Sequence, residues 1–283
     1  MQVKKVGVVG CGLMGAGIAQ VSSQSGYQVV VSEINDELLN KGLSAIGKQL
    51  AKAVEKGKLS EDDKGKILGR LKGTTKLDDF SDCDLVVEAA VENMDIKKKV
   101  FAELDRVCPP QTVLATNTSC LSITEISTAT KRPDKVIGTH FFNPVPVMKL
   151  LEVVTTIVSS EETLDTVKKF GESVGKTVIV AKDTPAFVVN RVLTPLMLEA
   201  IRVLESGLAT KEDIDNGMVL GCNHPMGPLT LADFVGLDTM YYITEAMYAE
   251  TKDPKFAAPL LLKRMVTAGQ LGRKTGKGFY DYT

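Results

Sequence analysis

The sequence predicts an α/β domain with a doubly wound, mostly parallel sheet, followed by an all-helical domain. In the first part of the chain, short runs of β-branched residues alternate with amphipathic helical segments, as in βαβ units with helices on both faces. A glycine-rich turn directly follows the first of these runs. Beyond Lys182 the strand-like runs stop, and apolar residues recur with helical spacing. We therefore expect two domains, residues 1–183 and 184–283.

The expected strands are short apolar runs bounded by polar or turn-forming residues. They cover residues 3–9, 27–32, 85–90, 112–116, 136–138, 150–155 and 178–181. The expected helices of the same domain are amphipathic, and one of them begins with a capping box, Ser122-Ile123-Thr124-Glu125. They cover residues 13–25, 35–57, 62–71, 96–107, the segment after Ser122, and 161–174.

In the second domain, Pro185 fits the first turn of a helix that Asp183 or Thr184 would cap. An apolar stripe of helical period runs over residues 188–204 and predicts a long helix. Pro195 lies inside this stripe, so we expect a kink there. Helical patterns continue toward the end of the domain, and their apolar faces are candidates for a dimer surface.

Composition and charge argue against several classes of protein. The chain has 283 residues, 44% of them hydrophobic, and its formal net charge is −1, so no strong field would attract nucleic acid or an anionic membrane. No apolar run approaches the roughly 20 residues of a membrane-spanning helix, and the first residues lack the pattern of a secretory signal. Five scattered cysteines and two histidines form no recognisable metal motif. We expect a cytoplasmic protein with reduced thiols and no bound metal.

The turn after the first strand reads Gly10-Cys11-Gly12-Leu13-Met14-Gly15, and Glu33 ends the next expected strand. A GxGxxG turn between a strand and a helix, with an acidic residue after the second strand, is typical of Rossmann-type dinucleotide-binding domains. Its glycines allow a tight turn, admit a pyrophosphate to the backbone, and let the helix pack on the strand. Glu33 can accept hydrogen bonds from ribose hydroxyls but would repel a 2′-phosphate, which favours NAD over NADP. The alternative is a glycine-rich turn that binds no ligand.

Polar residues also follow several of the other expected strands. They are Glu92, Lys97, Ser119, His140 and Asn143. Ligands of open α/β sheets bind outside the carboxyl ends of the strands, so these side chains should gather beside the glycine-rich turn. This convergence indicates an enzyme.

His140 and Glu152 both stand in apolar surroundings. A buried histidine is often a neutral core residue that donates to a carbonyl, and Glu152 could face water from an edge strand. A buried carboxylate otherwise needs a partner. A pair of His140 with Glu152 would satisfy both groups and fix the imidazole tautomer, as a general base requires.

Other candidates have simpler alternatives. Ser119 could be a turn or capping serine, and Asn190 could be a solvated asparagine beside the apolar stripe. Lys48, Lys52 and Lys56 are spaced about one helical turn apart, so they share one face of a helix. That face is either simply solvated or a basic stripe for a ligand that carries phosphate.

Longer motifs carry a resemblance to a known family. They are GCGLMGAGIAQ, DLVVEAAVENMDIKK, TNTSCLSITEI, GTHFFNPVPVMKLLEVV, DTPAFVVNR, HPMGPLTLADFVGLD and GRKTGKGFYDY. With these motifs the chain resembles the short-chain L-3-hydroxyacyl-CoA dehydrogenases, and most closely the bacterial 3-hydroxybutyryl-CoA dehydrogenases. The likeness covers essentially the whole chain, and HFFNP and DxPxFxxNR are its most specific parts.

The resemblance implies roles for individual residues. The catalytic histidine and its paired glutamate fall on His140 and Glu152, the serine that bonds the substrate's 3-oxygen falls on Ser119, and a helical-domain asparagine falls on Asn190. The implied cofactor contacts are Gly10, Gly12, Leu13, Met14, Gly15, Glu33, Glu92, Lys97, Ser119, Asn143 and Lys274. The implied substrate contacts are Ser119 and Asn190, and Lys52 and Lys56 of the basic stripe are further candidates for binding the CoA. Two residues depart from the family pattern, since Glu33 stands where aspartate is common and Cys120 where serine is common.

The resemblance also implies a reversible reaction. (S)-3-hydroxybutyryl-CoA and NAD⁺ would give acetoacetyl-CoA, NADH and a proton, in fatty acid or butyrate metabolism. His140 would take the 3-hydroxyl proton, Glu152 would orient His140, and Ser119 would position the oxygen. The expected assembly is a homodimer or higher homo-oligomer formed through the helical domain. Two alternatives stay open: a related dehydrogenase of a sugar acid or hydroxy acid without CoA, and a non-catalytic dinucleotide-binding protein.

Overall fold

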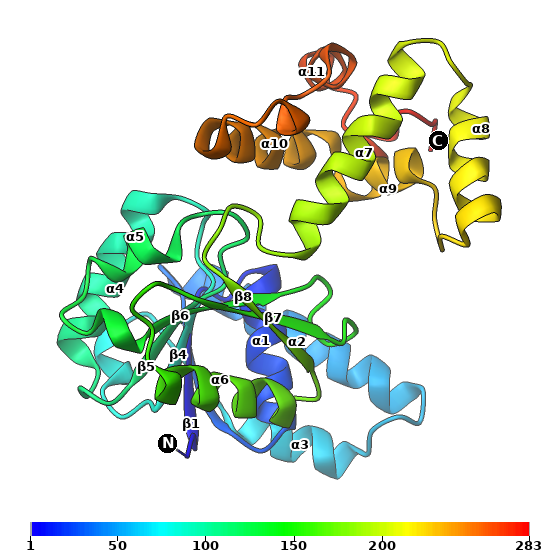
Figure 1. Ribbon diagram of the computed structural model, residues 1–283. Helices are drawn as coiled ribbons and strands as arrows, with labels where there is room; N and C mark the ends of the chain where they lie inside the picture. Colours follow the sequence, from blue (N-terminus) through cyan, green and yellow to red (C-terminus); the bar gives the residue numbers. More distant parts are fainter. Residues whose placement is uncertain (1, 283) are drawn as a thin grey trace. The chain divides into compact units, whose positions relative to one another are not determined.

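A computed structural model describes residues 2–282 of the protein (Figure 1). The chain divides after Asp183 into two compact units, Met1–Asp183 and Thr184–Thr283. Within residues 2–282, all eight strands lie in the first unit, and the second unit is built from helices. Among the described residues, no helix is both long and apolar enough to cross a membrane.

The first unit contains one eight-stranded sheet with the order β3-β2-β1-β4-β5-β6-β7-β8. The strands are β1 (Lys5–Val9), β2 (Gln28–Ser32), β3 (Leu71–Thr74), β4 (Leu85–Glu88), β5 (Val113–Thr116), β6 (Val136–Phe141), β7 (Leu150–Thr155) and β8 (Thr177–Lys182). Neighbouring strands pair in parallel, except that β6 and β7 are antiparallel. The predicted α/β class with a mostly parallel sheet is therefore confirmed.

Helices and short turns connect these strands. The helices are α1 (Leu13–Gln24), α2 (Asp36–Glu55), α3 (Glu61–Gly69), α4 (Met94–Val107), α5 (Ile123–Ser127) and α6 (Glu161–Ser173), with 3₁₀ turns η1 (Leu77–Phe80) and η2 (Pro133–Lys135). The serine of the predicted capping box caps α5, because Ser122 Oγ accepts a hydrogen bond from Glu125 N at 3.2 Å, while Glu125 Oε1 accepts one from Lys98 Nζ. The central strands β4, β5 and β6 are buried along their whole length, which explains their near-continuous apolar sequences.

Two strands differ from the prediction by more than a shift of one or two residues at an end, such as the end of β4 at Glu88 and not at Ala90. β3 was not expected, because its sequence Leu-Lys-Gly-Thr has a single apolar residue. It pairs with β2 at the edge of the sheet, where Gly73 leaves room for the side chains of Leu39 and Leu43. β6 extends beyond the predicted Gly138 as far as Phe141, so His140 lies inside the strand and not after it.

The second unit contains helices and turns of varied length. They are α7 (Val189–Glu205), α8 (Lys211–Asn216), the π-helical turn η3 (Gly217–Gly221), α9 (Pro228–Val235), α10 (Leu237–Thr251), η4 (Pro254–Phe256), α11 (Leu260–Thr267) and η5 (Arg273–Thr275). Their apolar faces meet in a core that includes Leu198, Ile201, Leu229 and Leu237, all fully buried.

The helix start predicted at Pro185 is wrong, because α7 begins only at Val189. Ala186 and Phe187 take φ values of 66° and 51°, which a right-handed helix excludes. Both side chains are buried, so local packing overrides the helix-start signal of the proline. Pro195 does lie inside α7, as the sequence predicts.

Candidate active site

The glycine loop, residues Gly10–Gly15, connects β1 to α1. Gly10 has a φ of +93°, which side chains rarely adopt, and an added Cβ would lie 2.7 Å from Ala89 O. At Gly15 an added Cβ would collide with the carbonyl oxygen of Gly10, so only glycine allows this close packing of helix and strand. At Gly12 an added Cβ would meet nothing within 4 Å, which leaves the backbone there open to a ligand.

The N-terminus of α1 differs from those of the other helices in this unit. Each of α2 to α6 has a side chain that accepts a hydrogen bond from the first turn. Within the described part of the unit, α1 alone among the α-helices starts without such a cap, with Gly12 at that position. Its first N–H groups and the positive end of its dipole are thus left for an anion. This arrangement fits the pyrophosphate of a dinucleotide.

Glu33 follows β2 and lies beside the glycine loop. Its Oε1 accepts a hydrogen bond from Cys11 N at 3.0 Å, and its Oε2 accepts one from Ile34 N at 2.9 Å. The carboxylate is partly exposed. These contacts place a negative charge next to the loop, where ribose hydroxyls could donate to it and a 2′-phosphate would be repelled.

His140 and Glu152 face each other across the antiparallel pair of β6 and β7. His140 Nδ1 lies 2.7 Å from Glu152 Oε2, and the two side chains are only 8% and 0% exposed. β7 has partners on both sides, so Glu152 does not face water from an edge strand. A hydrogen bond from Nδ1–H to the carboxylate fixes one tautomer of the imidazole and leaves Nε2 as its basic nitrogen.

The residues beside His140 connect it to the neighbouring strand ends. Phe142 packs against the imidazole, with ring centroids 4.6 Å apart, whereas Phe141 is buried in the core. Phe141 N donates to Asn117 Oδ1 at 2.9 Å. Because Asn117 directly follows β5, this bond joins the loop that carries Ser119 to the end of β6.

Ser119 is held by Glu92. Glu92 Oε1 accepts hydrogen bonds from Ser119 N at 2.8 Å, from Ser119 Oγ at 3.3 Å and from Thr118 Oγ1 at 2.5 Å. Burial opposes ionisation of Glu92, but the charge of Lys97 and the hydrogen bonds from Thr118 and Ser119 outweigh it. The pKa of Glu92 therefore lies below its usual value, and the carboxylate is charged at neutral pH.

Lys97 joins Glu92 to a second carboxylate, Glu88, which sequence reasoning missed. Lys97 Nζ lies 2.7 and 3.0 Å from the two oxygens of Glu88 and 3.3 Å from Glu92 Oε2. Glu88 ends β4 and is fully buried, and Thr116 Oγ1 at the end of β5 donates to it at 2.7 Å. The signal was present in the sequence, because Glu88 interrupts the apolar run LVVEAA just as Glu152 interrupts LLEVV.

Comparison of the sequence with models of known protein families shows which family this chain belongs to. Residues 5–184 match the NAD binding domain of 3-hydroxyacyl-CoA dehydrogenases, and residues 187–282 match the C-terminal domain of the same enzymes. The chain belongs to the 3-hydroxyacyl-CoA dehydrogenase family. It is an NAD-dependent oxidoreductase, and residues 5–184 form its NAD-binding domain.

Several relatives of this dehydrogenase match over their whole length. A 3-hydroxybutyryl-CoA dehydrogenase of Clostridioides difficile is 49% identical over 278 residues, which cover 98% of this chain and 99% of the relative. One from Mycobacterium tuberculosis is also 49% identical, with 99% of each chain covered. The crystal structure of the (S)-3-hydroxybutyryl-CoA dehydrogenase of Ralstonia eutropha superposes with a TM-score of 0.97 at 46% identity and covers 100% of both chains.

Most remaining candidates of the dehydrogenase's first unit lie on its surface, whereas Met14 is partly buried against the core. Asn143 follows β6 in an exposed loop and precedes Pro144 through a cis peptide bond. Lys48 and Lys52 are exposed on α2, and Lys56 is exposed at its C-terminal cap. Leu13, in the glycine loop, is 70% exposed. Their exposure agrees with ligand contacts and equally with a solvated surface.

Asn190 and Lys274 belong to the second unit of the dehydrogenase. Asn190 is the second residue of α7 and is partly exposed. Lys274 lies in the short turn η5 and forms an ion pair with Asp238 of α10. The structure thus gives Lys274 a partner within its own unit.

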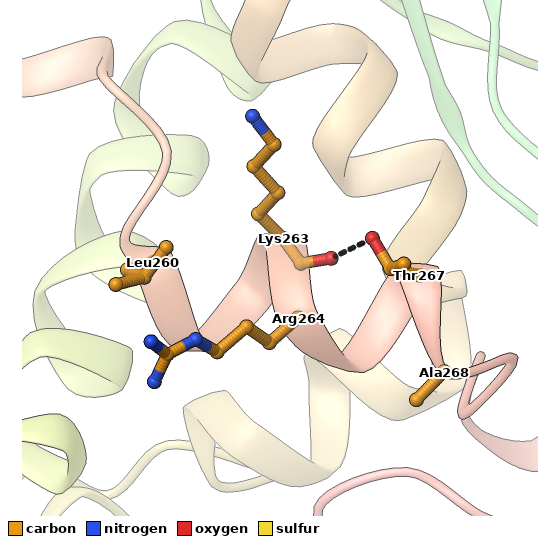
Figure 2. Close-up of a pocket in the computed structure, with 5 residues that line it drawn as sticks. All are labelled: Leu260, Lys263, Arg264, Thr267 and Ala268. Carbon is orange, nitrogen blue, oxygen red and sulfur yellow. Dashed lines mark hydrogen bonds between the residues drawn. The ribbon is translucent and has the colours of Figure 1, made fainter.

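A hollow of about 290 Å³ lies along α11 in the second unit (Figure 2). Leu260, Lys263, Arg264, Thr267 and Ala268 line it, and Thr267 Oγ1 donates to the carbonyl oxygen of Lys263 at 2.9 Å. None of the site residues predicted from the sequence lines this hollow. The candidate active site is therefore the group of side chains at the carboxyl edge of the sheet.

Proposed function

We propose that the protein is a 3-hydroxybutyryl-CoA dehydrogenase that interconverts (S)-3-hydroxybutyryl-CoA and acetoacetyl-CoA with NAD. The observation that carries the proposal is the buried pair of His140 and Glu152, 2.7 Å apart, in a chain that belongs to the 3-hydroxyacyl-CoA dehydrogenase family. Relatives that match the whole chain bear the name of this activity.

In the oxidative direction, His140 acts as the general base. Glu152 accepts a hydrogen bond from Nδ1–H, so Nε2 is the nitrogen that receives the proton of the substrate's 3-hydroxyl group. Bound NAD⁺ supplies the acceptor for the hydride that leaves C3 of the substrate. The imidazolium that forms is then stabilised by the adjacent carboxylate, and Phe142 shields one side of the ring from water.

Other residues bind and position the reactants. Ser119 positions the 3-oxygen, and Asn190 of the helical domain contributes to binding the acyl portion. The cofactor candidates are the glycine loop with Leu13 and Met14, together with Glu33, Glu92, Lys97, Asn143 and Lys274. Lys52 and Lys56 are proposed to bind phosphate groups of CoA, since both are exposed cations on one face of α2 and its C-terminal cap.

The proposal extends to the organisation of the protein. Residues 1–183 bind NAD, and residues 184–283 contribute substrate contacts and the surface of a homodimer or higher homo-oligomer. The enzyme works in the cytoplasm, in fatty acid or butyrate metabolism. Light scattering of the purified protein measures the assembly, and a monomer would contradict this part.

A substrate comparison tests the proposed function. NADH oxidation is followed with acetoacetyl-CoA and, in parallel, with free acetoacetate, and NADPH replaces NADH in a third series. We expect rapid oxidation of NADH with acetoacetyl-CoA. The reaction with NADPH should be slow because Glu33 repels a 2′-phosphate, and the reaction with free acetoacetate should be slow because it lacks the CoA phosphates that Lys52 and Lys56 are proposed to bind. Equal rates with free acetoacetate would instead favour a dehydrogenase of a hydroxy acid without CoA.

A further inference from the structure

We propose that Glu88 is a positioning residue that acts on Ser119 through Lys97 and Glu92. The three charged residues form a continuous chain, here called the Glu88–Lys97–Glu92 chain. It runs from the end of β4 to the loop after β5. The inference rests on the proposed function, because Ser119 is taken to position the reacting oxygen.

The first link of the chain is fixed within the sheet. Glu88 is 0% exposed and is the last residue of β4. Its Oε1 accepts from Ala90 N at 2.7 Å, and its Oε2 accepts from Thr116 Oγ1 at 2.7 Å. Glu88 and Thr116 are partners in the register of β4 and β5, so both strands hold this carboxylate.

The middle link is a lysine with little freedom. Lys97 is 1% exposed, and its ammonium group has three hydrogens to donate. Three carboxylate oxygens surround it, two from Glu88 at 2.7 and 3.0 Å and one from Glu92 at 3.3 Å. The orientation of Lys97 is therefore set by Glu88, and the position of Glu92 Oε2 is set by Lys97.

The last link reaches the active-site serine. The other oxygen of Glu92 accepts from Ser119 N at 2.8 Å and from Ser119 Oγ at 3.3 Å. A shift of Glu92 would thus move both the backbone and the hydroxyl group of Ser119. A buried ion pair adds little to the stability of a fold compared with apolar residues of similar shape. We therefore assign to the Glu88–Lys97–Glu92 chain the role of fixing the position of Ser119.

The location of the Glu88–Lys97–Glu92 chain agrees with this role. Ala89 directly follows Glu88, and its N–H donates to Val9 O at 2.7 Å, one residue before the glycine loop. The carbonyl oxygen of Ala89 lies where a side chain at Gly10 would have to fit. Residues 88–92 therefore run from the glycine loop to the loop that carries Ser119.

The test begins with Glu88→Gln, which keeps the shape but removes the charge opposite Lys97. We expect kcat with acetoacetyl-CoA and NADH to fall roughly 10- to 100-fold, because a misplacement on the order of 1 Å can cost that much. The KM for acetoacetyl-CoA should change little. In a Ser119→Ala background, the same substitution should cause a much smaller further loss of kcat, since both changes act on one interaction.

Two further variants separate positioning from folding. Glu88→Asp keeps the charge opposite Lys97, so its kcat and its Tm should both lie closer to those of the wild type than the values for Glu88→Gln do. Asp105→Asn is the matched control, because Asp105 is also on α4 and pairs with the largely buried Arg132 at 2.7 Å. It should lower the Tm and leave kcat unchanged.

The outcomes distinguish this inference from the proposed function. Equal fold losses from Glu88→Gln in the wild-type and Ser119→Ala backgrounds would overturn the role of Glu88. A loss of kcat in Asp105→Asn as large as the loss in Glu88→Gln would also overturn it, because the loss of kcat would then follow from destabilisation alone. A wild-type enzyme without turnover of acetoacetyl-CoA would instead overturn the proposed function itself.

Discussion

The sheet contains two buried glutamates with different partners. Glu152 in β7 and Glu88 at the end of β4 are both 0% exposed, and each interrupts an apolar run. Glu152 lies beside the imidazole of His140, which can accept a proton at its second ring nitrogen, whereas Glu88 lies beside the ammonium group of Lys97, which has no acceptor atom. The difference teaches that the partner decides the role of a buried carboxylate. One pair can move a proton, and the other can only hold a fixed charge in place.

Removal of the base should have the largest effect. We expect His140→Gln to lower kcat roughly 10²- to 10⁴-fold, the usual contribution of a general base. The Kd for NADH, measured by fluorescence, should stay close to that of the wild type, since the glycine loop and Glu33 are untouched. Turnover near the wild-type rate would show that His140 is not the base.

Removal of the orienting carboxylate should have a smaller effect. Glu152→Gln keeps a group that can accept from Nδ1–H but loses the charge that stabilises the imidazolium. We expect a loss of kcat of roughly 10- to 100-fold and a changed dependence of kcat on pH. An unchanged rate and an unchanged pH profile would refute the pairing.

Glu92, the last residue of the Glu88–Lys97–Glu92 chain, should instead affect how the stability of the fold depends on pH. Burial opposes ionisation of Glu92, but Lys97 and the hydrogen bonds from Thr118 and Ser119 hold its folded pKa below the ordinary value of 4.5. A carboxyl group with a depressed folded pKa adds stability above its unfolded pKa, and this stability is lost as pH falls through the folded pKa. The Tm difference between wild type and Glu92→Gln should therefore be constant above 4.5 and shrink below it. A difference that grew with acidity would contradict this sign.

The smallest effect is expected at Cys120, a buried residue beside Glu92. Burial and then the charge of Glu92 raise the pKa of the Cys120 thiol to about 12, so it stays protonated near neutral pH. Cys120→Ser should leave kcat nearly unchanged. Mass spectrometry after alkylation near pH 8 should find Cys222, which is exposed, modified and Cys120 unmodified. Rapid alkylation of Cys120 would contradict the assigned environment.

Much of the fold could be predicted from local sequence signals. The apolar runs marked most of the buried parallel strands, and the capping box marked the start of α5. Signals of this kind failed where distant contacts decide the conformation. β3 forms because β2 and α2 provide its partners, and Ala186 and Phe187 leave the helical region because their burial requires it.

In the candidate site, too, the sequence could predict what depends on sheet topology but not what depends on side-chain packing. The sequence could indicate that Ser119, Glu92 and His140 lie near strand ends, because sheet topology brings those ends together. The sequence could not indicate that Glu92 accepts hydrogen bonds from Ser119 or that Lys97 lies between two carboxylates, since these contacts depend on side-chain packing. Glu88 was overlooked, although a lone carboxylate in an apolar run had already singled out Glu152.

The most direct test of the central claim is the kcat of the double variant His140→Gln with Glu152→Gln, measured beside both single variants. If the two residues form one general-base device, the double variant should be no slower than His140→Gln alone, because Glu152 acts only through the imidazole. Losses that multiply in the double variant would show that Glu152 contributes independently of His140 and would contradict the account.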